Sequence, residues 1–374
     1  MAESTTTRSE LDDLVRGSQV IVCSGSGGVG KTTTAAVIAM QAAIDGRRAI
    51  VVTIDPARRL ADALGLAGLT NEPALVNGDW KGELWAMMLD TKATFDGLVE
   101  RYARNEDQAK TILANGFYRN ISSSLSGTQE YMASEKLYEL AIEGDYDLVV
   151  VDTPPTRNAL DFLQAPQRLA RFLDHRLYKV LMMPTKGIVK AVNFAAQTVM
   201  RSIAKVVGAE VIADAVEFFA AFEGMEAGFT ERARHVDELL RKPETSFVLI
   251  ASPRADTVAE ATYFANELHR LGIAVRGLVV NRMSPLFDPN GECEDLEDTS
   301  GSTVLQDHFR CLSESNFVAR GELQHLVGIS ERVAPAPVVG VPEQSFEVSD
   351  TESLRALGRV LFDPESVLKV VSQG

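Results

Sequence analysis

Apolar residues gather along the chain in short continuous runs bounded by glycine, proline and polar turn residues. Six runs have this form, at positions 20–23, 49–54, 84–89, 148–151, 246–251 and 275–280. Continuous rather than alternating runs of this length are typical of parallel strands that are buried on both faces. The pattern therefore predicts a sheet that is covered on both sides.

Helical patterns separate most of these runs. The segment 32–43 is followed by Gly46, and the segment 257–271 is followed by Gly272. A glycine just beyond the last turn is a common end of a helix. Strands that alternate with helices predict an α/β fold, with a doubly wound, mostly parallel sheet and right-handed crossovers. Ligands of such sheets bind at the carboxyl ends of the strands.

One stretch interrupts the alternation. Residues 166–241 contain no strand pattern, and their apolar residues recur at helical spacing. We predict a helical subdomain here, inserted into a single domain that spans residues 1–374. Its apolar side chains either pack the subdomain or offer a surface to an apolar partner. Those considered for this role are Met182, Met183, Met200, Phe218, Phe219, Phe222 and Met225.

Composition excludes several classes of function. The 374 residues are 45% apolar and carry a formal net charge of −15, which disfavours binding to nucleic acid or to anionic lipid. Residues 1–17 lack the apolar core of a signal peptide, and no run of 18 apolar residues predicts a membrane span. The sequence therefore predicts a cytoplasmic protein without a transmembrane segment.

Two further features concern metals. Residues 288–302 hold six carboxylates but lack the ligand spacing of an EF-hand, so they predict an acidic mobile loop. The three cysteines, Cys23, Cys293 and Cys311, form neither a CxxC zinc motif nor a disulfide framework.

The residues Gly25-Ser26-Gly27-Gly28-Val29-Gly30-Lys31-Thr32 lie directly between a predicted strand and a predicted helix. This is the context of the phosphate-binding loop of nucleoside triphosphatases (the P-loop). Its glycines let the backbone approach phosphate oxygens, and the following helix adds the positive end of its dipole. Lys31 can reach the β- and γ-phosphates, and the hydroxyl of Thr32 can bind Mg²⁺. Thr33 either contacts phosphate or only begins the helix.

Two aspartates follow predicted strands. Asp152 ends the run 148–151, where a carboxylate can hold magnesium directly or through water, or can cap the next helix. Asp55 follows the run 49–54, where it either orients the attacking water or caps a short helix at 58–64. Together with the loop, these positions predict a protein that binds ATP or GTP with Mg²⁺.

These motifs resemble the arsenite-pump and guided-entry (tail-anchored protein targeting) ATPase family, which carries a deviant Walker A loop. The resemblance rests on GSGGVGKTT at 25–33, TIDPA at 53–57 and VVVDTPPT at 149–156, with weaker matches at 126–132, 279–282 and 338–357. It spans most of the chain and looks similar to actinobacterial members described as anion-transporting ATPases.

The resemblance implies a role for each site residue. Asp55 positions the hydrolytic water, Asp152 binds magnesium, and Asn281 and Pro342 contact adenine, which implies ATP rather than GTP. The whole chain is then one P-loop ATPase domain that works as a dimer, and the nucleotide state moves the helical subdomain.

The sequence also departs from the family pattern. The family loop usually carries a lysine that reaches the partner's phosphates, and this chain has Ser26 at that position. This implies either a homodimer that hydrolyses ATP slowly or a heterodimer with a paralogous ATPase that keeps the lysine. No CxxC pair or thiol cluster for a metalloid is present in the sequence.

Three functions remain open at this point. The favoured one is an ATP-driven dimeric switch that handles a hydrophobic protein client or a membrane partner. The second is the energising subunit of an anion or metalloid export pump, which requires a membrane permease. The third is a weakly catalytic, regulatory ATP-binding subunit.

Overall fold

The computed structural model describes residues 9–54, 59–124, 128–154, 156–174, 209–287 and 303–368. The chain divides into two compact units. The first comprises Met1–Met88, Gly144–Leu160 and Pro243–Gly374, and the second comprises Leu89–Glu143 and Asp161–Lys242.

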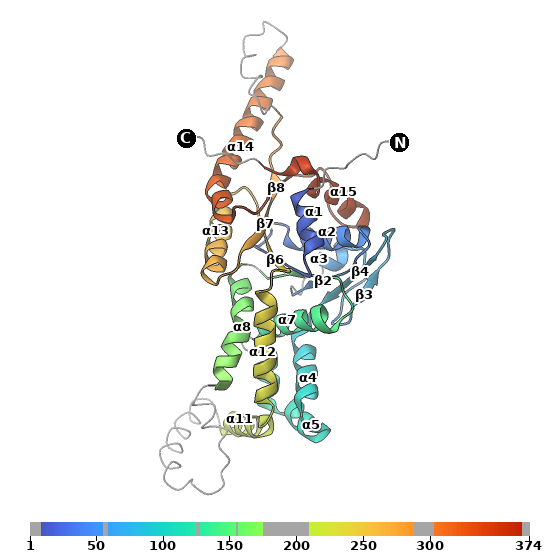
Figure 1. The fold of residues 1–374 in the computed structure, drawn as a ribbon. Coiled ribbons are helices and arrows are strands. Elements are labelled where there is room, and N and C mark those ends of the chain that lie inside the picture. Colours follow the sequence, from blue (N-terminus) through green and yellow to red (C-terminus); the bar gives the residue numbers. More distant parts are fainter. Residues whose placement is uncertain are drawn as a thin grey trace. The chain divides into compact units, whose positions relative to one another are not determined.

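The first unit is built on one sheet, which in the described part of the chain has eight strands in the order β3-β4-β2-β5-β1-β6-β7-β8 (Figure 1). All neighbouring strands are parallel except β3 and β4. The strands are β1 Val20–Gly25, β2 Arg48–Thr53, β3 Ala74–Val76, β4 Glu83–Met88, β5 Leu148–Asp152, β6 Thr245–Ala251, β7 Val275–Met283 and β8 Val338–Pro342. This confirms the predicted doubly wound α/β fold, and each of the six apolar runs corresponds to one strand.

Two strands were not predicted from the sequence. β3 has only three residues, and β8 has the sequence VVGVP, in which glycine and proline weaken a strand pattern. Both lie at the edges of the sheet, where pairing on one side alone is enough to hold a short strand.

Helices cover both faces of the sheet. Figure 1 shows α1, α2 and α15 on one face and α13 with α14 on the other. The helices of this unit are α1 Glu10–Gly17, α2 Lys31–Ile44, α3 Arg59–Ala63, α13 Ala255–Arg270, α14 Thr303–Val333 and α15 Thr351–Leu361, with a 3₁₀ turn at Pro364–Ser366. Helix α8, Thr156–Asp174, begins in the first unit and continues in the second.

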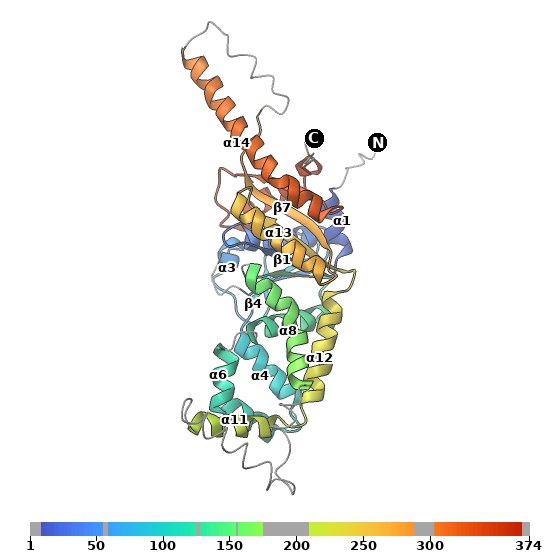
Figure 2. The ribbon, with the colours of Figure 1, turned by 90° about the vertical axis from the view of Figure 1, so that its left-hand side faces the viewer.

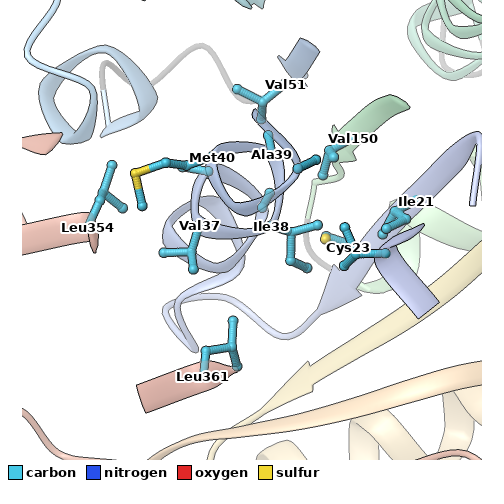
Figure 3. Packing of buried hydrophobic residues seen from close by; sticks show 14 of the residues in the cluster. Ile21, Cys23, Val37, Ile38, Ala39, Met40, Val51, Val150, Leu354 and Leu361 are labelled. Carbon is cyan, nitrogen blue, oxygen red and sulfur yellow. The ribbon is translucent and has the colours of Figure 1, made fainter. Parts of the chain in front are cut away.

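A large core cluster surrounds α2 (Figure 3). Val37 and Met40 of α2 lie beside Leu354 of α15, and Ile38 lies beside Cys23 of β1. Because α2 is buried almost all round, packing fixes its position against the sheet. The first turn of α2, and the loop that leads into it, are therefore held firmly at the carboxyl edge of β1.

The second unit is helical. It contains α4 Thr91–Tyr102, α5 Glu106–Ala114, α6 Gly116–Ser124, α7 Thr128–Tyr138, a π-helical turn at Glu139–Glu143, α11 Ala209–Phe222 and α12 Glu226–Leu240. The predicted insertion at 166–241 supplies one part of this unit, and residues that precede β5 supply the other.

The aromatic residues of α11 form the core of this helical unit. Phe218, Phe222 and Met225 are at most 5% exposed and pack with Tyr118 and Phe229. Of the two roles that the sequence left open, packing is the one that the structure shows for these three residues, whereas Phe219 is only partly buried against the same core. Met182, Met183, Met200 and the acidic segment 288–302 lie outside the described residues.

Within the residues that the structure describes, no helix is long and apolar enough to cross a membrane.

Candidate functional site

The glycine-rich loop follows β1 and ends at the first residue of α2. Gly25 ends the strand so close to β6 that a Cβ atom there would lie 2.0 Å from the carbonyl oxygen of Ile250. Gly30 has a φ of +97°, and a Cβ atom there would lie 2.3 Å from Nδ2 of Asn281. Only glycine fits either position without a shift of its neighbours. The two glycines therefore set the shape of the loop, rather than merely making it flexible.

Lys31 lies over the loop that precedes it. Its Nζ donates a hydrogen bond to the carbonyl oxygen of Ser26 over 2.8 Å, and its side chain is 8% exposed. The ammonium group and the N-terminus of α2 thus meet at one place, and both favour an anion. This arrangement fits a phosphate group.

Asp152 links the first turn of α2 to two strands. Its Oδ2 accepts a hydrogen bond from Oγ1 of Thr32 over 2.7 Å and another from Oγ1 of Thr53 over 3.0 Å. Asp152 ends β5, pairs in register with Thr53 at the end of β2, and is 1% exposed. A buried carboxylate beside a threonine hydroxyl is a set of hard oxygen donors that suits magnesium.

Two oxygen-bearing side chains of the site lie together, those of Thr32 and Asp152. Among the described residues, no group of three or more His, Cys, Asp or Glu side chains could enclose a metal ion. Mg²⁺ characteristically binds through one or two protein oxygens together with water and substrate phosphates. Thr32 and Asp152 fit that pattern.

A further layer supports Asp152 from β1. Thr153 donates from Oγ1 to the carbonyl oxygen of Cys23 over 2.8 Å and lies 3.3 Å from Oγ of Ser24. Burial raises the pKa of the Cys23 thiol, and the nearby charge of Asp152 raises it further. Cys23 therefore remains a neutral thiol and acts as a packing residue.

The last residues of the glycine-rich loop contact the end of β7. Asn281 donates from Nδ2 to the carbonyl oxygen of Val29 over 2.9 Å. The next residue, Arg282, has a φ of +61°, and the register of β7 with β8 shifts between Asn281 and Met283. Pro342 ends β8 opposite Met283. The bulge thus places Asn281 and Pro342 at the same edge of the sheet as the loop.

Helix α14 holds the segment that follows β7. A carboxylate of α14, Glu322, accepts hydrogen bonds from the backbone N of Ser284 over 2.7 Å and from its Oγ over 2.9 Å. Asn316, which is 4% exposed, accepts a hydrogen bond from the backbone N of Phe287 over 3.0 Å. Glu322 lies 38 residues from Ser284 in sequence, and no motif could have identified it.

The structure therefore brings most of the predicted site residues together. Gly25, Ser26, Gly27, Gly28, Val29, Gly30, Lys31, Thr32, Thr33, Asp152, Asn281 and Pro342 gather at the carboxyl edge of the sheet, Thr33 in the first turn of α2. Asp55 lies outside the described residues. Sequence analysis missed Thr53 and Glu322. The position of Thr53, at the end of an apolar run and two residues before Asp55, was the available signal for the first of these.

Comparison with known proteins gives a consistent result. A model of the family described as "Anion-transporting ATPase" matches residues 18–363. The chain is 25% identical to "ATPase get3" of Schizosaccharomyces japonicus over 347 residues, which cover 92% of each chain. It is 29% identical to "ATPase ASNA1 homolog" of Cryptosporidium parvum over 77% of this chain and 72% of the relative. It is 26% identical to "ATPase GET3A" of Arabidopsis thaliana over 73% and 67%, respectively.

Proposed function

This chain belongs to the anion-transporting ATPase family and is an ATPase, and we propose that it is a cytoplasmic switch driven by Mg-ATP. The observation that carries the proposal is the contact of Thr32 and Thr53 with one carboxylate oxygen of Asp152. This contact joins the phosphate-binding loop to the strand that leads into the segment of Asp55.

Each residue of the site has a task in phosphoryl transfer. The loop N–H groups and Lys31 bind and orient the β- and γ-phosphates, and Asn281 and Pro342 contact the base. Thr32 and Asp152 hold Mg²⁺, which supplies positive charge at the phosphate oxygens when it is bound. Asp55 accepts a hydrogen bond from the attacking water and orients it toward the γ-phosphate.

The switch follows from the shared carboxylate. With Mg²⁺ bound, the hydroxyl of Thr32 would offer an oxygen lone pair to the metal and would keep its proton for the hydrogen bond to Asp152, to which Thr53 also donates. Through Thr53 and Asp152, the end of β2 and the segment of Asp55 that follows it are linked to the phosphate-binding loop. This part of the chain can act as a switch only if ATP and ADP differ in their affinities for two of its conformations.

Ser26 bears on the partner of this switch. The serine is 5% exposed and lies inside the loop, and its short neutral side chain cannot reach across an interface to a second nucleotide. A cation supplied from a partner is worth on the order of 10³ to 10⁵ in phosphoryl-transfer rate. We therefore propose slow turnover for a homodimer and faster turnover for a heterodimer with a paralogue that carries the lysine.

The output of the switch is the handling of a hydrophobic protein client or of a membrane partner. Similarity to the GET3 and ASNA1 ATPases over most of the chain supports this output. A regulatory subunit with weak activity is the second candidate, and Ser26 is the residue that favours it.

The test is a pull-down of tagged Asp55→Asn protein from its native cells in the presence of ATP, with Lys31→Ala as the matched control. We expect the first variant to retain a lysine-bearing paralogue with apolar or membrane-anchored proteins, and the second to lose them. Recovery of a membrane permease without such clients would instead indicate an export pump. Rapid ATP turnover by the purified homodimer, unchanged by any partner, would overturn the paralogue proposal.

A further inference from the structure

A cavity of about 530 Å³ lies in the first unit, at the edge of the sheet opposite the proposed nucleotide site. Residues at the amino ends of four parallel strands line it, namely Ser18 before β1, Ser246 in β6, Val275 in β7 and Pro337 before β8. Helix α1 and the C-terminal ends of α13 and α14 complete the wall, and Figure 2 shows the end of α14 close to α1. This volume is typical of pockets that bind small molecules.

Part of the cavity wall is apolar and well packed. Ala265, Ile273 and Val333 line the cavity and are at most 8% exposed. Beside them, the hydroxyl oxygens of Ser18 and Ser246 lie 2.8 Å apart and join the end of α1 to β6. Small-molecule pockets typically combine such an apolar lining with a few polar groups that orient the ligand. The lining therefore suits a ligand with an apolar portion.

Charged side chains of opposite sign line the same cavity from different elements. Arg276 of β7 and Arg332 of α14 supply guanidinium groups, and α1 supplies the carboxylates of Glu10 and Asp13. All four side chains are exposed to solvent. Among the described residues, none of the four forms an ion pair. The positive and the negative groups of this cavity are thus held apart, and both kinds can bind a ligand.

Helix ends account for some of these charges but not for all of them. Glu10 and Asp13 lie in the first turn of α1, and Arg332 lies in the last turn of α14, where the helix dipole favours such charges. His269, in the last turn of α13, also lines the cavity. Arg276 lies on a strand, so no helix dipole explains it. Its guanidinium group offers planar, paired donors, which match the geometry of a carboxylate.

We propose that this cavity binds a small apolar zwitterion, such as a dipeptide of apolar residues. The ligand's carboxylate pairs with Arg276 and Arg332, and its ammonium group pairs with Glu10 and Asp13. A simple anion would be repelled by the two carboxylates of α1, whereas a zwitterion compensates the charges of both signs. The two ends of an extended dipeptide lie about 7 Å apart, so it can bridge groups that do not meet directly. The cavity shares no residue with the proposed nucleotide site, so its test is independent of the ATPase switch.

Calorimetric titration of the full chain with leucyl-leucine tests the proposal. N-acetyl-leucyl-leucine lacks the ammonium group and leucyl-leucine amide lacks the carboxylate, whereas all three ligands have the same apolar side chains. We expect leucyl-leucine to bind at least about tenfold more tightly than either blocked form, because each blocked form leaves charged groups of the cavity without a partner. Equal affinity for the three ligands, or no binding at millimolar concentrations, would overturn the proposal.

Two double variants assign the two ends of the ligand. In the variant with Arg276→Gln and Arg332→Gln, the preference for leucyl-leucine over its amide should disappear, and the preference over the N-acetyl form should remain. In the variant with Glu10→Gln and Asp13→Asn, we expect the converse. This pattern separates recognition of each end from a general effect on the fold, which would weaken binding of all three ligands alike.

Arg270→Gln is the matched control, because Arg270 is an exposed arginine of α13 that does not line the cavity. It should change neither preference. Thermal unfolding of each variant shows whether it is folded, and the comparison of the three ligands on the unsubstituted protein stands without any variant. If the N-acetyl form binds as tightly as leucyl-leucine and depends only on the two arginines, the cavity is an anion site and the proposal is wrong.

Discussion

Thr32 and Asp152 are 120 residues apart in sequence, and the hydroxyl of the first donates to Oδ2 of the second over 2.7 Å. This bond joins the first turn of α2 to the end of β5, and Thr53 reaches the same oxygen from β2 over 3.0 Å. One buried carboxylate oxygen thus serves two threonines with different tasks, since only Thr32 lies in the phosphate-binding loop motif. The first prediction separates these tasks.

Thr32→Val should raise the Mg²⁺ concentration needed for half-maximal ATP turnover, and lower the maximal rate at least about tenfold, because valine keeps the shape but removes a ligand oxygen. Thr53→Val removes the other donor to Asp152 and is the matched control. It should leave the Mg²⁺ requirement near that of the original protein. A magnesium titration of phosphate release measures both, and equal requirements in the two variants would argue against a metal at Thr32.

Lys31→Ala should reduce ATP turnover to background, because it removes the ammonium group that lies over the glycine-rich loop. Lys110→Ala, at an exposed position paired with Glu106, is the control and should retain full turnover. Phosphate release and binding of a fluorescent ATP analogue measure the two effects separately. Undiminished turnover by Lys31→Ala would remove the basis of the proposed site.

Asp55→Asn should bind ATP with little change in affinity and hydrolyse it on the order of 10² times more slowly. The reason is that an amide oxygen accepts a hydrogen bond from the attacking water less strongly than a carboxylate oxygen does. Single-turnover hydrolysis with pre-bound ATP isolates this step. If the variant hydrolyses ATP at the normal rate, Asp55 only caps the helix that follows it.

Glu322→Gln should weaken ATP binding at least about threefold, since the neutral amide holds Ser284 less firmly than the carboxylate does. The substitution should weaken binding of the adenine base rather than of the phosphates. The ratio of ATP to GTP affinity should therefore decrease, whereas affinity for inorganic triphosphate should not change. Glu314→Gln, on the same helix, is the control. Equal losses for ATP, GTP and triphosphate would mean that Glu322 supports the fold rather than the base site.

Arg232→Met should destabilise the helical unit by about 3 kcal/mol, because it leaves the carboxylate of Glu135 buried without its partner. Arg232 is 7% exposed and donates from Nε to Glu135 over 2.6 Å. Arg234→Met, at an exposed position on the same helix, is the control and should cost little. Urea unfolding followed by circular dichroism gives the comparison.

The same variant predicts a dependence on pH. Burial raises the pKa of Glu135 above its ordinary value of 4.5 even beside Arg232, and loss of the arginine raises the pKa further. Between the ordinary and the raised pKa, the folded variant holds a proton that the unfolded chain has released. Folding is therefore favoured as the pH falls through this window, and the deficit of Arg232→Met should shrink on acidification from neutral pH. A deficit that is constant with pH would show that Glu135 is not the group left unpaired.

The fold could be predicted because a strand buried on both faces has a continuous apolar run, which can be recognised within a short segment of the sequence. Each of the six apolar runs forms a parallel strand, since a strand covered on both faces needs apolar side chains at consecutive positions. The segment 32–43 and α2 differ by one residue at each end, because a glycine-rich loop and Gly46 limit the helix on both sides. The sequence of β8, VVGVP, has no such run, and this strand is held by its pairing with β7.

The residues of the proposed nucleotide site also differ in whether the sequence alone could identify them. A phosphate-binding loop is a continuous peptide whose backbone and side chains act together, so Gly25 to Thr32 could be predicted as such a loop from their order alone. The bond of Thr53 to Asp152 depends on the register of β2 with β5, and the hold of Glu322 on Ser284 depends on how α14 packs against β7. Neither register nor helix packing is encoded within a short segment, because both arise from contacts between residues far apart in the chain. The sequence by itself thus determined the type of fold and predicted a phosphate-binding loop, whereas the tertiary structure decided which distant side chains bond to each other around that loop.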